Sequence, residues 1–462
     1  MDTGLQVDIL DGMDKSFRPS DLDQPLLLPA DLPEWLPCDH LALFVSDVVD
    51  ALDLSAIYKS YEGDGRGQPP YDPAMMVKLL LYAYCTGRPS SRVIERATHE
   101  DIAFRVLATN QHPDHDTVAE FRKRHLAALA GLFVQVLRLC QQAGLVKLGQ
   151  VALDSTKIKA NASKHKAMSY DRMVKAEAEL KHEVAELLRH AQVVDDGEDA
   201  RYGKGQQGDT LPEELARRES RLKKIQEAKA ALERESAELS PSQKRQAQGG
   251  SRKKRPDPPP QGPKGDAPDP KAQRNFTDPD SRIMFDATTK SFEQAYSAQI
   301  AVDGTAQVIV AATVTQEGND KQQLVPMVAQ VIENVGRRPK QVLADAGYFS
   351  EAAVSDPSLA GIRLYVSPDK DRHGGQARKG RSPVRGRATE RMRRKLRTAK
   401  GRAIYRLRKA IAEPPLGQIK EVRKFRRFLL RGLPKTFGEW MLISLTHNLL
   451  KMWRAGPQPA LG

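Results

Sequence analysis

Residues 291–315 read SFEQAYSAQIAVDGTAQVIVAATVT, and this stretch decides the fold class. Two apolar, alternating runs flank the turn sequence DGT, which is typical of a β-hairpin. Three more short apolar runs have the length of strands: QVALDS at 150–155, KQVLA at 340–344 and GIRLYVS at 361–367. Because the segment NDKQQLVPMVAQVIENVG at 319–336 reads as a helix between them, an α/β domain is predicted.

The chain before these strands reads as helical from 31 to 145, after an N-terminal tail of residues 1–30. Apolar residues recur at helical spacing in DHLALFVSDVVDALDL at 39–54. Pro73 suits the first turn of a helix, Gly87 a helix end, and Ser90 or Ser91 an N-cap. These short helices favour a helix-turn-helix DNA-binding domain and a plain all-α domain about equally.

Residues 161–275 separate the first predicted strand from the hairpin. Two charged helical stretches, near 168–192 and 212–238, predict a helical hairpin, and the second carries a narrow apolar stripe of Leu215, Leu222, Ile225 and Leu232. The segment from 240 to 273 is rich in proline, glycine and charge, which predicts a disordered linker. Its SRKKRP sequence at 251–256 could contact DNA, but a solvated linker is favoured.

Composition excludes several classes of protein. The 462 residues suggest two or three folding units. No run of about 18 uncharged apolar residues is present, and no basic segment followed by an apolar core opens the chain, so neither a membrane span nor a secretory signal is predicted. Cys38, Cys85 and Cys140 are scattered singly, which excludes a disulfide scaffold or a zinc ribbon and indicates buried thiols in a reducing cytoplasm.

The charge is concentrated in one segment. Lys and Arg number 73 against 59 Asp and Glu, a net charge of +14 that favours a polyanionic partner. Residues 369–409 contain 17 basic and 3 acidic residues, which accounts for the whole excess. A solvated helix would carry more interspersed acids, so we expect this segment to contact DNA phosphates.

Three carboxylates stand out by their context. Asp154 and Asp345 each follow an apolar strand run, and Glu413 lies on a helix-prone stretch after the basic segment. Neighbouring strands that end together would place both aspartates at one edge of the sheet, where a glutamate from a packed helix can join them. The alternative is that each strand-end aspartate only caps a turn.

Clustered carboxylates predict metal-ion chemistry. Like charges within a few ångströms raise one another's pKa, and bound cations relieve that cost. Oxygen ligands suit Mg²⁺, with Mn²⁺ as its substitute, and a pair of ions activates the attacking oxygen and stabilises the leaving oxygen of a phosphoryl transfer. The predicted reaction is two-metal phosphoryl transfer on DNA.

The sequence YRLRKAIAEPPLGQIK, which contains Tyr405, Arg408, Glu413 and Lys420, resembles the tyrosine-arginine-glutamate-lysine signature of bacterial insertion-sequence DDE transposases. Four residues rather than the family's three separate Arg408 from Glu413. Further similar segments extend over nearly the whole chain: YDPAMMVKLLLYAYCTGRPSSRVIERA, HDTVAEFRKRH, LDSTKIKANASKHKAMSYDRM, FTDPDSRIM, NDKQQLVP and LADAGYFS.

The resemblance implies a fold and a set of site residues. The implied fold is an RNase H-like mixed-sheet catalytic domain, formed by 146–160 together with 276–455 and interrupted by the helical insertion. Asp154, Asp345 and Glu413 match the three catalytic, metal-binding carboxylates, with Glu421 and Glu439 as alternatives for the third.

Basic residues near these carboxylates have accessory roles in this hypothesis. Lys420 lies seven residues, or two helical turns, after Glu413, so its ammonium could hold a phosphate beside the metals. Tyr405 and Arg408 would line the DNA backbone or, alternatively, pack locally. The remaining predicted phosphate contacts are Arg393, Arg394, Lys395 and Arg397.

Other motifs are interpreted as structural. His112 and His115 lack a third metal ligand nearby in the sequence. The loops GDGRGQ at 63 and HGG at 373 do not open a phosphate-binding helix. Asp278 and Asp280 belong to a turn.

The functional prediction is a cytoplasmic, nucleoid-associated bacterial transposase. It would bind terminal inverted repeats through its N-terminal helices, cut and join double-stranded DNA, and act as a homodimer or larger synaptic complex away from membranes. Two alternatives stay open: a catalytically inactive DNA-binding regulator derived from a transposase, and a nuclease that hydrolyses without joining.

Overall fold

The computed structural model describes residues 31–61, 69–202, 213–238, 268–286, 290–369 and 387–456. The predicted N-terminal tail, residues 240–267 of the predicted linker, with SRKKRP, and the two glycine loops lie outside these residues. The disorder predicted for 268–273 is wrong, because these residues form a turn that leads into a short strand, β3 (Gln273–Asn275). No helix within the described part of the chain is long and apolar enough to cross a membrane.

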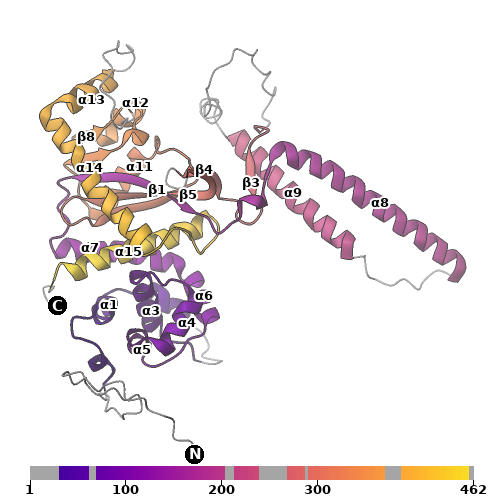
Figure 1. Cartoon of the computed structure of the whole chain (residues 1–462), viewed down its shortest axis with the longest axis horizontal. Coiled ribbons are helices and arrows are strands. Elements are labelled where there is room, and N and C mark those ends of the chain that lie inside the picture. The colour runs from indigo at the N-terminus through magenta and orange to yellow at the C-terminus, as the bar shows by residue number, and fades with distance from the viewer. Residues whose placement is uncertain are drawn as a thin grey trace, which may run out of the picture.

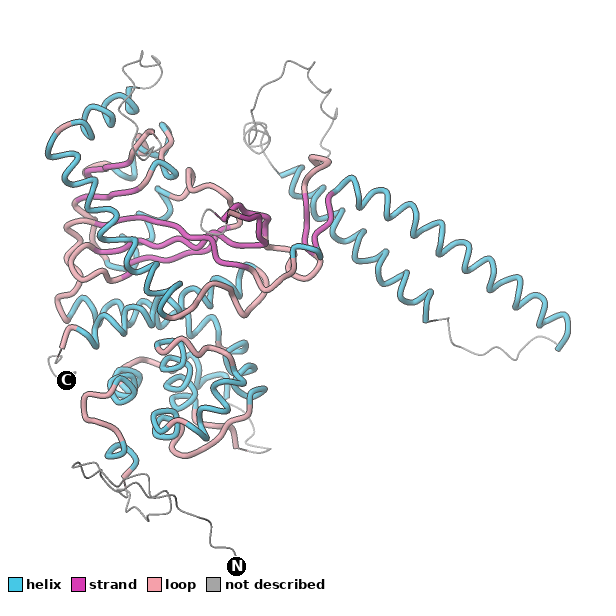
Figure 2. Tube along the Cα trace, viewed as in Figure 1, coloured by secondary structure: helices cyan, strands magenta, loops and turns pink. Residues whose placement is uncertain are grey.

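The centre of the molecule is a six-stranded mixed sheet (Figure 2). Its strands are β1 (Val151–Lys159), β4 (Arg282–Asp286), β5 (Ser291–Asp303), β6 (Ile309–Thr315), β7 (Gln341–Ala344) and β8 (Arg363–Val366). The predicted hairpin of β5 and β6 is confirmed, and β5 also pairs antiparallel with β1. On its other edge β1 pairs parallel with β7, which pairs parallel with β8. The order β6-β5-β1-β7-β8, with β4 on β5, confirms the predicted RNase H-like α/β fold class.

The N-terminal region is all-α. Its helices are η1 (Leu32–Trp35), α1 (Leu41–Asp50), α2 (Ser55–Tyr58), η2 (Lys59–Tyr61), α3 (Pro73–Cys85), α4 (Ser91–Glu100), α5 (Ile102–Leu107), α6 (His115–Arg124) and α7 (Leu126–Gln142). Helix α3 begins as expected, since Pro73 occupies its first turn and the Asp72 carboxylate accepts hydrogen bonds from the N–H groups of Ala74 and Met75. Nearly all of α3 is buried, so it is the central helix of this region.

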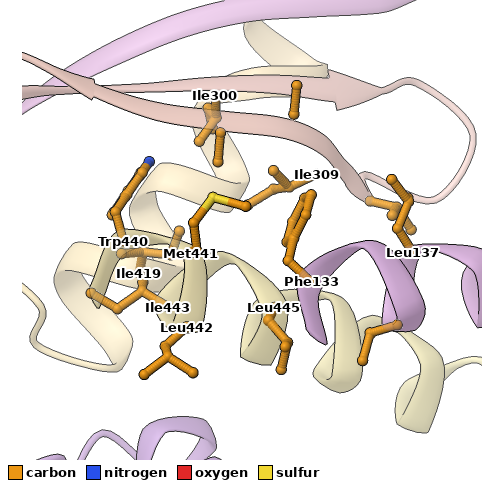
Figure 3. Close-up of a cluster of buried hydrophobic side chains, with 14 of the residues drawn as sticks. Phe133, Leu137, Ile300, Ile309, Ile419, Trp440, Met441, Leu442, Ile443 and Leu445 are labelled. Atoms are coloured by element: carbon orange, nitrogen blue, oxygen red, sulfur yellow. The ribbon is translucent and has the colours of Figure 1, made fainter. Parts of the chain in front are cut away.

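Further helices cover the sheet and form the connections between its strands. They are η4 (Ala346–Tyr348), α11 (Leu324–Val335), α12 (Glu351–Val354), η5 (Pro357–Leu359), α13 (Arg387–Arg397), α14 (Ala399–Gly417), the π-helical turn η6 (Gln418–Val422) and α15 (Leu433–Arg454). Helices α7 and α15 lie between the sheet and the N-terminal helices (Figure 1). Figure 3 shows the core that they form, in which Trp440 and Met441 of α15 meet Ile300 of β5 and Phe133 of α7.

The insertion after β1 is helical and projects from the sheet (Figure 1). It comprises η3 (Lys164–Lys166), β2 (Ala167–Ser169), α8 (Tyr170–Tyr202), α9 (Glu213–Glu238) and β3 (Gln273–Asn275). Helices α8 and α9 share a small core that includes Met173, Ile225 and Leu232. Glu177 of α8 also bonds Lys229 of α9 at 2.8 Å. Strands β2 and β3 pair at the base of this arm.

The expectation that Asp154 lies at the end of its strand is wrong. Strand β1 continues to Lys159 and pairs with β5 along its whole length, up to Lys159 opposite Ala295. Only the first residues of β1 form an apolar, buried run. The rest of the strand is less buried and carries mostly polar side chains. The apolar run therefore ended before the strand did.

Candidate active site

Asp154 and Asp345 occupy matching positions on neighbouring strands. Val151 pairs with Val342 and Ala152 with Leu343, so the same register two residues further brings Asp345, the residue after β7, beside Asp154. The Oδ1 atom of Asp154 accepts a hydrogen bond from the Ser155 N–H at 2.9 Å. The Oδ1 atom of Asp345 accepts one from Gly347 N–H at 2.9 Å, as the N-cap of η4. The two predicted aspartates are therefore brought together by the parallel pairing of β1 and β7.

Both carboxyls have raised pKa values. Burial is the main cause for Asp154, whose pKa rises to about 6, and the charges of Asp345 and Glu413 raise it further. Burial and the charge of Asp320 raise the pKa of Asp345. The guanidinium of Arg408 lowers the pKa of both groups. Mutual repulsion between carboxylates at this sheet edge is thus partly balanced by one buried cation.

Helix α14 contributes the third predicted carboxylate. It packs against β1 and β5, and Tyr405, Arg408 and Glu413 line one cavity of about 560 Å³ together with Asp345. Successive residues of a helix turn by 100°, so Arg408 and Glu413 lie about 140° apart around the helix axis. Both side chains nevertheless line this cavity, so the four-residue gap does not remove either from a shared site.

Two prolines follow Glu413 without ending α14. Pro414 has no N–H to donate to the carbonyl of Ala410. Instead, the side-chain amide of Gln307 donates to that carbonyl at 2.8 Å. An external donor thus replaces the missing helical hydrogen bond, which lets the helix continue past Glu413.

Lys420 lies on η6, beside the cavity rather than in its lining. Its Nζ donates to Thr156 Oγ1 at 3.0 Å and to the Lys157 carbonyl at 3.4 Å. Thr156 is two residues after Asp154, so their side chains share one face of β1. Lys420 lines a separate hollow of about 230 Å³ with Lys157, Lys159, Arg426 and Arg427, among others.

The predicted phosphate-binding residues of α13 divide into two groups. Arg393 binds Asp369 through two hydrogen bonds of 2.8 and 2.7 Å. Lys395 donates to the Leu364 carbonyl at 2.8 Å and lies over the Tyr365 ring, and burial lowers its pKa. Arg394 and Arg397 are exposed. The first two therefore tie α13 to the end of β8, and only the other two present their charges to solvent.

The alternative glutamates are engaged elsewhere. Glu421 forms an ion pair with Arg426. Glu439 is fully buried, and its carboxylate accepts hydrogen bonds of 3.0 Å from the N–H groups of Leu429 and Leu430. Burial raises the pKa of Glu439 to about 7. Neither glutamate lines the cavity with Asp345.

The motifs interpreted as structural have local partners. Asp278 accepts hydrogen bonds from the Tyr296 hydroxyl at 2.7 Å and from the Gly432 N–H at 3.1 Å. Asp280 accepts one from the N–H of Leu433, the first residue of α15. These two aspartates join the turn before β4 to the start of α15.

The two histidines of the NQHPDHDT motif also have local contacts. His112 stacks on His99 with ring centroids 3.8 Å apart. His115 lies 2.9 Å from Glu95. Both side chains therefore connect α4 to the segment that begins α6.

Sequence reasoning missed Asp320. It follows β6 and lines the same cavity as Asp345 and Glu413. It accepts hydrogen bonds from Ser155 Oγ at 2.8 Å and Gln299 Nε2 at 2.5 Å. One signal was present: Ser297 and Gln299 are polar residues in the middle of β5, and both are fully buried.

The chemistry of the site fits a divalent cation. Its donors are carboxylate oxygens, which Mg²⁺ and Mn²⁺ prefer. A cation would relieve the repulsion that raises the pKa of Asp154. In the present conformation, no three His, Cys, Asp or Glu side chains of the described ranges are gathered closely enough to hold a metal ion.

Two family models match the chain. One is described as Transposase domain (DUF772) and matches residues 30–124. The other is described as Transposase DDE domain and matches residues 266–449, which include Asp345 and Glu413. No curated protein and no solved structure matches the chain.

Proposed function

Since the chain is an insertion-sequence DDE transposase, a DNA-binding enzyme with nuclease and transferase chemistry, we propose that Asp154, Asp345 and Glu413 form its active site. The observation that carries this proposal is the parallel register of β1 and β7, which aligns the two aspartates. Two observations support the inclusion of Glu413: α14 packs against β1, and the charge of Glu413 raises the pKa of Asp154.

The three carboxylates would hold two divalent cations, Mg²⁺ or Mn²⁺ in its place. When bound, such a pair activates the attacking oxygen and stabilises the leaving oxygen. Arg408 is buried beside the aspartates, and its charge would hold a non-bridging phosphate oxygen of the DNA within the cavity. Tyr405 lines the same cavity, and its ring would form one wall of the path that the DNA backbone takes.

The reaction consists of two displacements at phosphorus. In the first, water attacks the phosphodiester at the end of the element, the P–O3′ bond breaks, and a free 3′-OH is released. In the second, that hydroxyl attacks a target phosphodiester, so one P–O bond forms as another breaks. The three carboxylates and Arg408 would orient the reacting groups of both displacements at one site.

Exposed basic residues beside the cavity supply a path for DNA. Arg402, Arg406 and Lys409 of α14 line a hollow of about 320 Å³ that shares Tyr405, Arg408 and Lys409 with the larger cavity. Arg394 and Arg397 are exposed on the neighbouring helix α13, where Arg394 also lies 3.8 Å from Glu390. These side chains would neutralise phosphates without reading bases.

Recognition of the terminal inverted repeats is assigned to the N-terminal helices. Arg92 and Arg96 are exposed on α4 and lie one turn apart, so they project from one face of that helix. Helix α4 packs against α6, which gives it a rigid support. We propose a homodimer or larger synaptic complex, because two ends of one element must be processed together.

The test is Mg²⁺-dependent cleavage of a DNA fragment that carries the element's end. Asp154→Ala, Asp345→Ala and Glu413→Ala should each lose cleavage while DNA binding is retained. Full activity of Glu413→Ala would exclude Glu413 as the third carboxylate. A wild-type chain that binds and never cuts would favour the inactive regulator, and a chain that cuts but cannot join a pre-cut end would favour the nuclease.

A further inference from the structure

A polar network lies beneath the candidate active site. The hydroxyl of Tyr348 donates to Gln299 Oε1, and Gln299 Nε2 donates to Asp320 Oδ1 at 2.5 Å. Asp320 Oδ2 accepts from Ser155 Oγ at 2.8 Å, and Ser297 Oγ lies 3.5 Å from Oδ1. Asp320 is thus the acceptor on which side chains from β1 and β5 converge.

Asp320 lies close to Asp345 and contacts the strand of Asp154 through Ser155. A Cβ built on Gly347 would lie 3.0 Å from Asp345 Oδ1 and 3.3 Å from Asp320 Oδ2, so both carboxylates border the same glycine. Asp154 and Ser155 are consecutive residues of β1 and project to opposite faces of the sheet. Asp320 therefore contacts β1 through Ser155, on the side of the strand opposite the Asp154 side chain.

We propose that Asp320 is a positioning residue that fixes the relative placement of Asp154 and Asp345. This inference rests on the proposed function of those two aspartates. Both oxygens of Asp320 already accept hydrogen bonds from uncharged donors on β1 and β5. Through Ser155 it holds the strand that carries Asp154, and through Gln299 and Tyr348 it holds the turn that carries Asp345.

The network requires an acceptor at position 320. Tyr348 and Gln299 are buried, and the Tyr348 hydroxyl uses the Gln299 carbonyl oxygen, so the Gln299 amide must face an acceptor. An asparagine at 320 keeps one oxygen for Gln299, and its N–H₂ group can donate to the Ser155 hydroxyl, which accepts as well as donates. An alanine at 320 removes both contacts, so Asp320→Ala is the variant that breaks the network.

The experiment compares wild type with Asp320→Ala in steady-state cleavage, DNA affinity and thermal unfolding. We expect kcat to fall by about 10- to 100-fold while KM and the DNA Kd stay within about twofold. Glu333→Ala is the control, because Glu333 is an exposed carboxylate on α11 and does not line the cavity. It should cut at the wild-type rate.

Three outcomes would overturn the proposal. One is an Asp320→Ala variant that cuts at the wild-type rate while Asp345→Ala is inactive; wild-type activity of Asp345→Ala would instead contradict the proposed active site. Another is an Asp320→Cys variant whose activity is restored by Cd²⁺ or Mn²⁺, which would make residue 320 a metal ligand. If Asp320→Ala does not fold, Ser155→Ala removes one arm without a change of charge, and it should lose about 3- to 10-fold in kcat. The third outcome is a wild-type rate for Ser155→Ala.

Discussion

Replacing Gly347 with alanine separates the geometry of the candidate site from the stability of the fold. The added Cβ would lie 3.0 Å from Asp345 Oδ1 and 3.3 Å from Asp320 Oδ2. Gly347 does not have the positive φ at which alanine is strained. Alanine lowers the entropy of the unfolded chain, which stabilises the fold by about 0.4–1 kcal/mol, and the two tight contacts offset that gain. We expect the free energy of unfolding to change by less than about 1 kcal/mol.

Activity should respond more strongly than stability. Ordinary van der Waals contact begins at 3.4 Å, so the Asp345 carboxylate must move by about 0.4 Å to accommodate the new methyl group. Misplacement of a catalytic group by about 1 Å can cost about 10²-fold in rate. A shift of a few tenths of an ångström therefore predicts a loss of about tenfold, or about 1.4 kcal/mol in activation free energy.

The assay is cleavage of end-bearing DNA, measured beside thermal unfolding of the same preparation. Gly318→Ala is the control, because Gly318 lines the same cavity and its built Cβ meets nothing within 4 Å. We expect Gly318→Ala to retain both activity and stability. Wild-type cleavage by Gly347→Ala, or an equal loss in Gly318→Ala, would refute the placement of Asp345 at the reacting centre.

Three further predictions concern stability and DNA binding. Burial lowers the pKa of His447 to about 3, below its unfolded value of 6.5, so the unfolded chain binds more protons and stability is lost as pH falls from 6.5 towards 3. Urea unfolding should show about 2 kcal/mol of this loss between pH 6.5 and 5, and His447→Gln should lose less. Gly87→Ala should cost about 2–4 kcal/mol in urea unfolding, because Gly87 has a φ of +75° and its built Cβ lies 2.6 Å from the Arg423 carbonyl oxygen. Gly144→Ala, with a φ of +71° and no neighbour within 4 Å, should cost only the backbone strain of about 1–2 kcal/mol. Arg406→Gln should weaken binding to any DNA sequence and reduce the slope of log K against log salt by about 1 in fluorescence anisotropy; an unchanged slope would exclude a phosphate contact.

Local pattern predicted the elements of this fold well. The alternation in 291–315 correctly predicted the hairpin of β5 and β6, and the apolar run before Asp345 correctly predicted that β7 ends there. The same rule misplaced the end of β1, because a strand can continue by hydrogen bonding to β5 after its apolar residues stop. Side-chain pattern reports burial, whereas strand length depends on the partner strand.

The charge pattern predicted the contacts of single basic residues less well than the apolar pattern predicted the strands. The basic segment was visible in the sequence, yet Arg393 is paired with Asp369 and Lys395 is bonded to the Leu364 carbonyl. Each partner lies more than 20 residues before its cation in the chain. A count of charges cannot tell a cation that binds the protein from one that faces solvent.

The sequence by itself determined the helical N-terminal region, the strands of the sheet, the helical insertion and the family to which the chain belongs, because periodicity, caps and motifs act over a few neighbouring residues. Only the tertiary structure decided that Asp345 stands beside Asp154, since this depends on the register between strands about 190 residues apart. It also revealed Asp320, whose importance comes from buried donors on β1 and β5 rather than from its own neighbours in the chain. Long-range hydrogen-bond pairing selects which side chains meet, and no short segment carries that information.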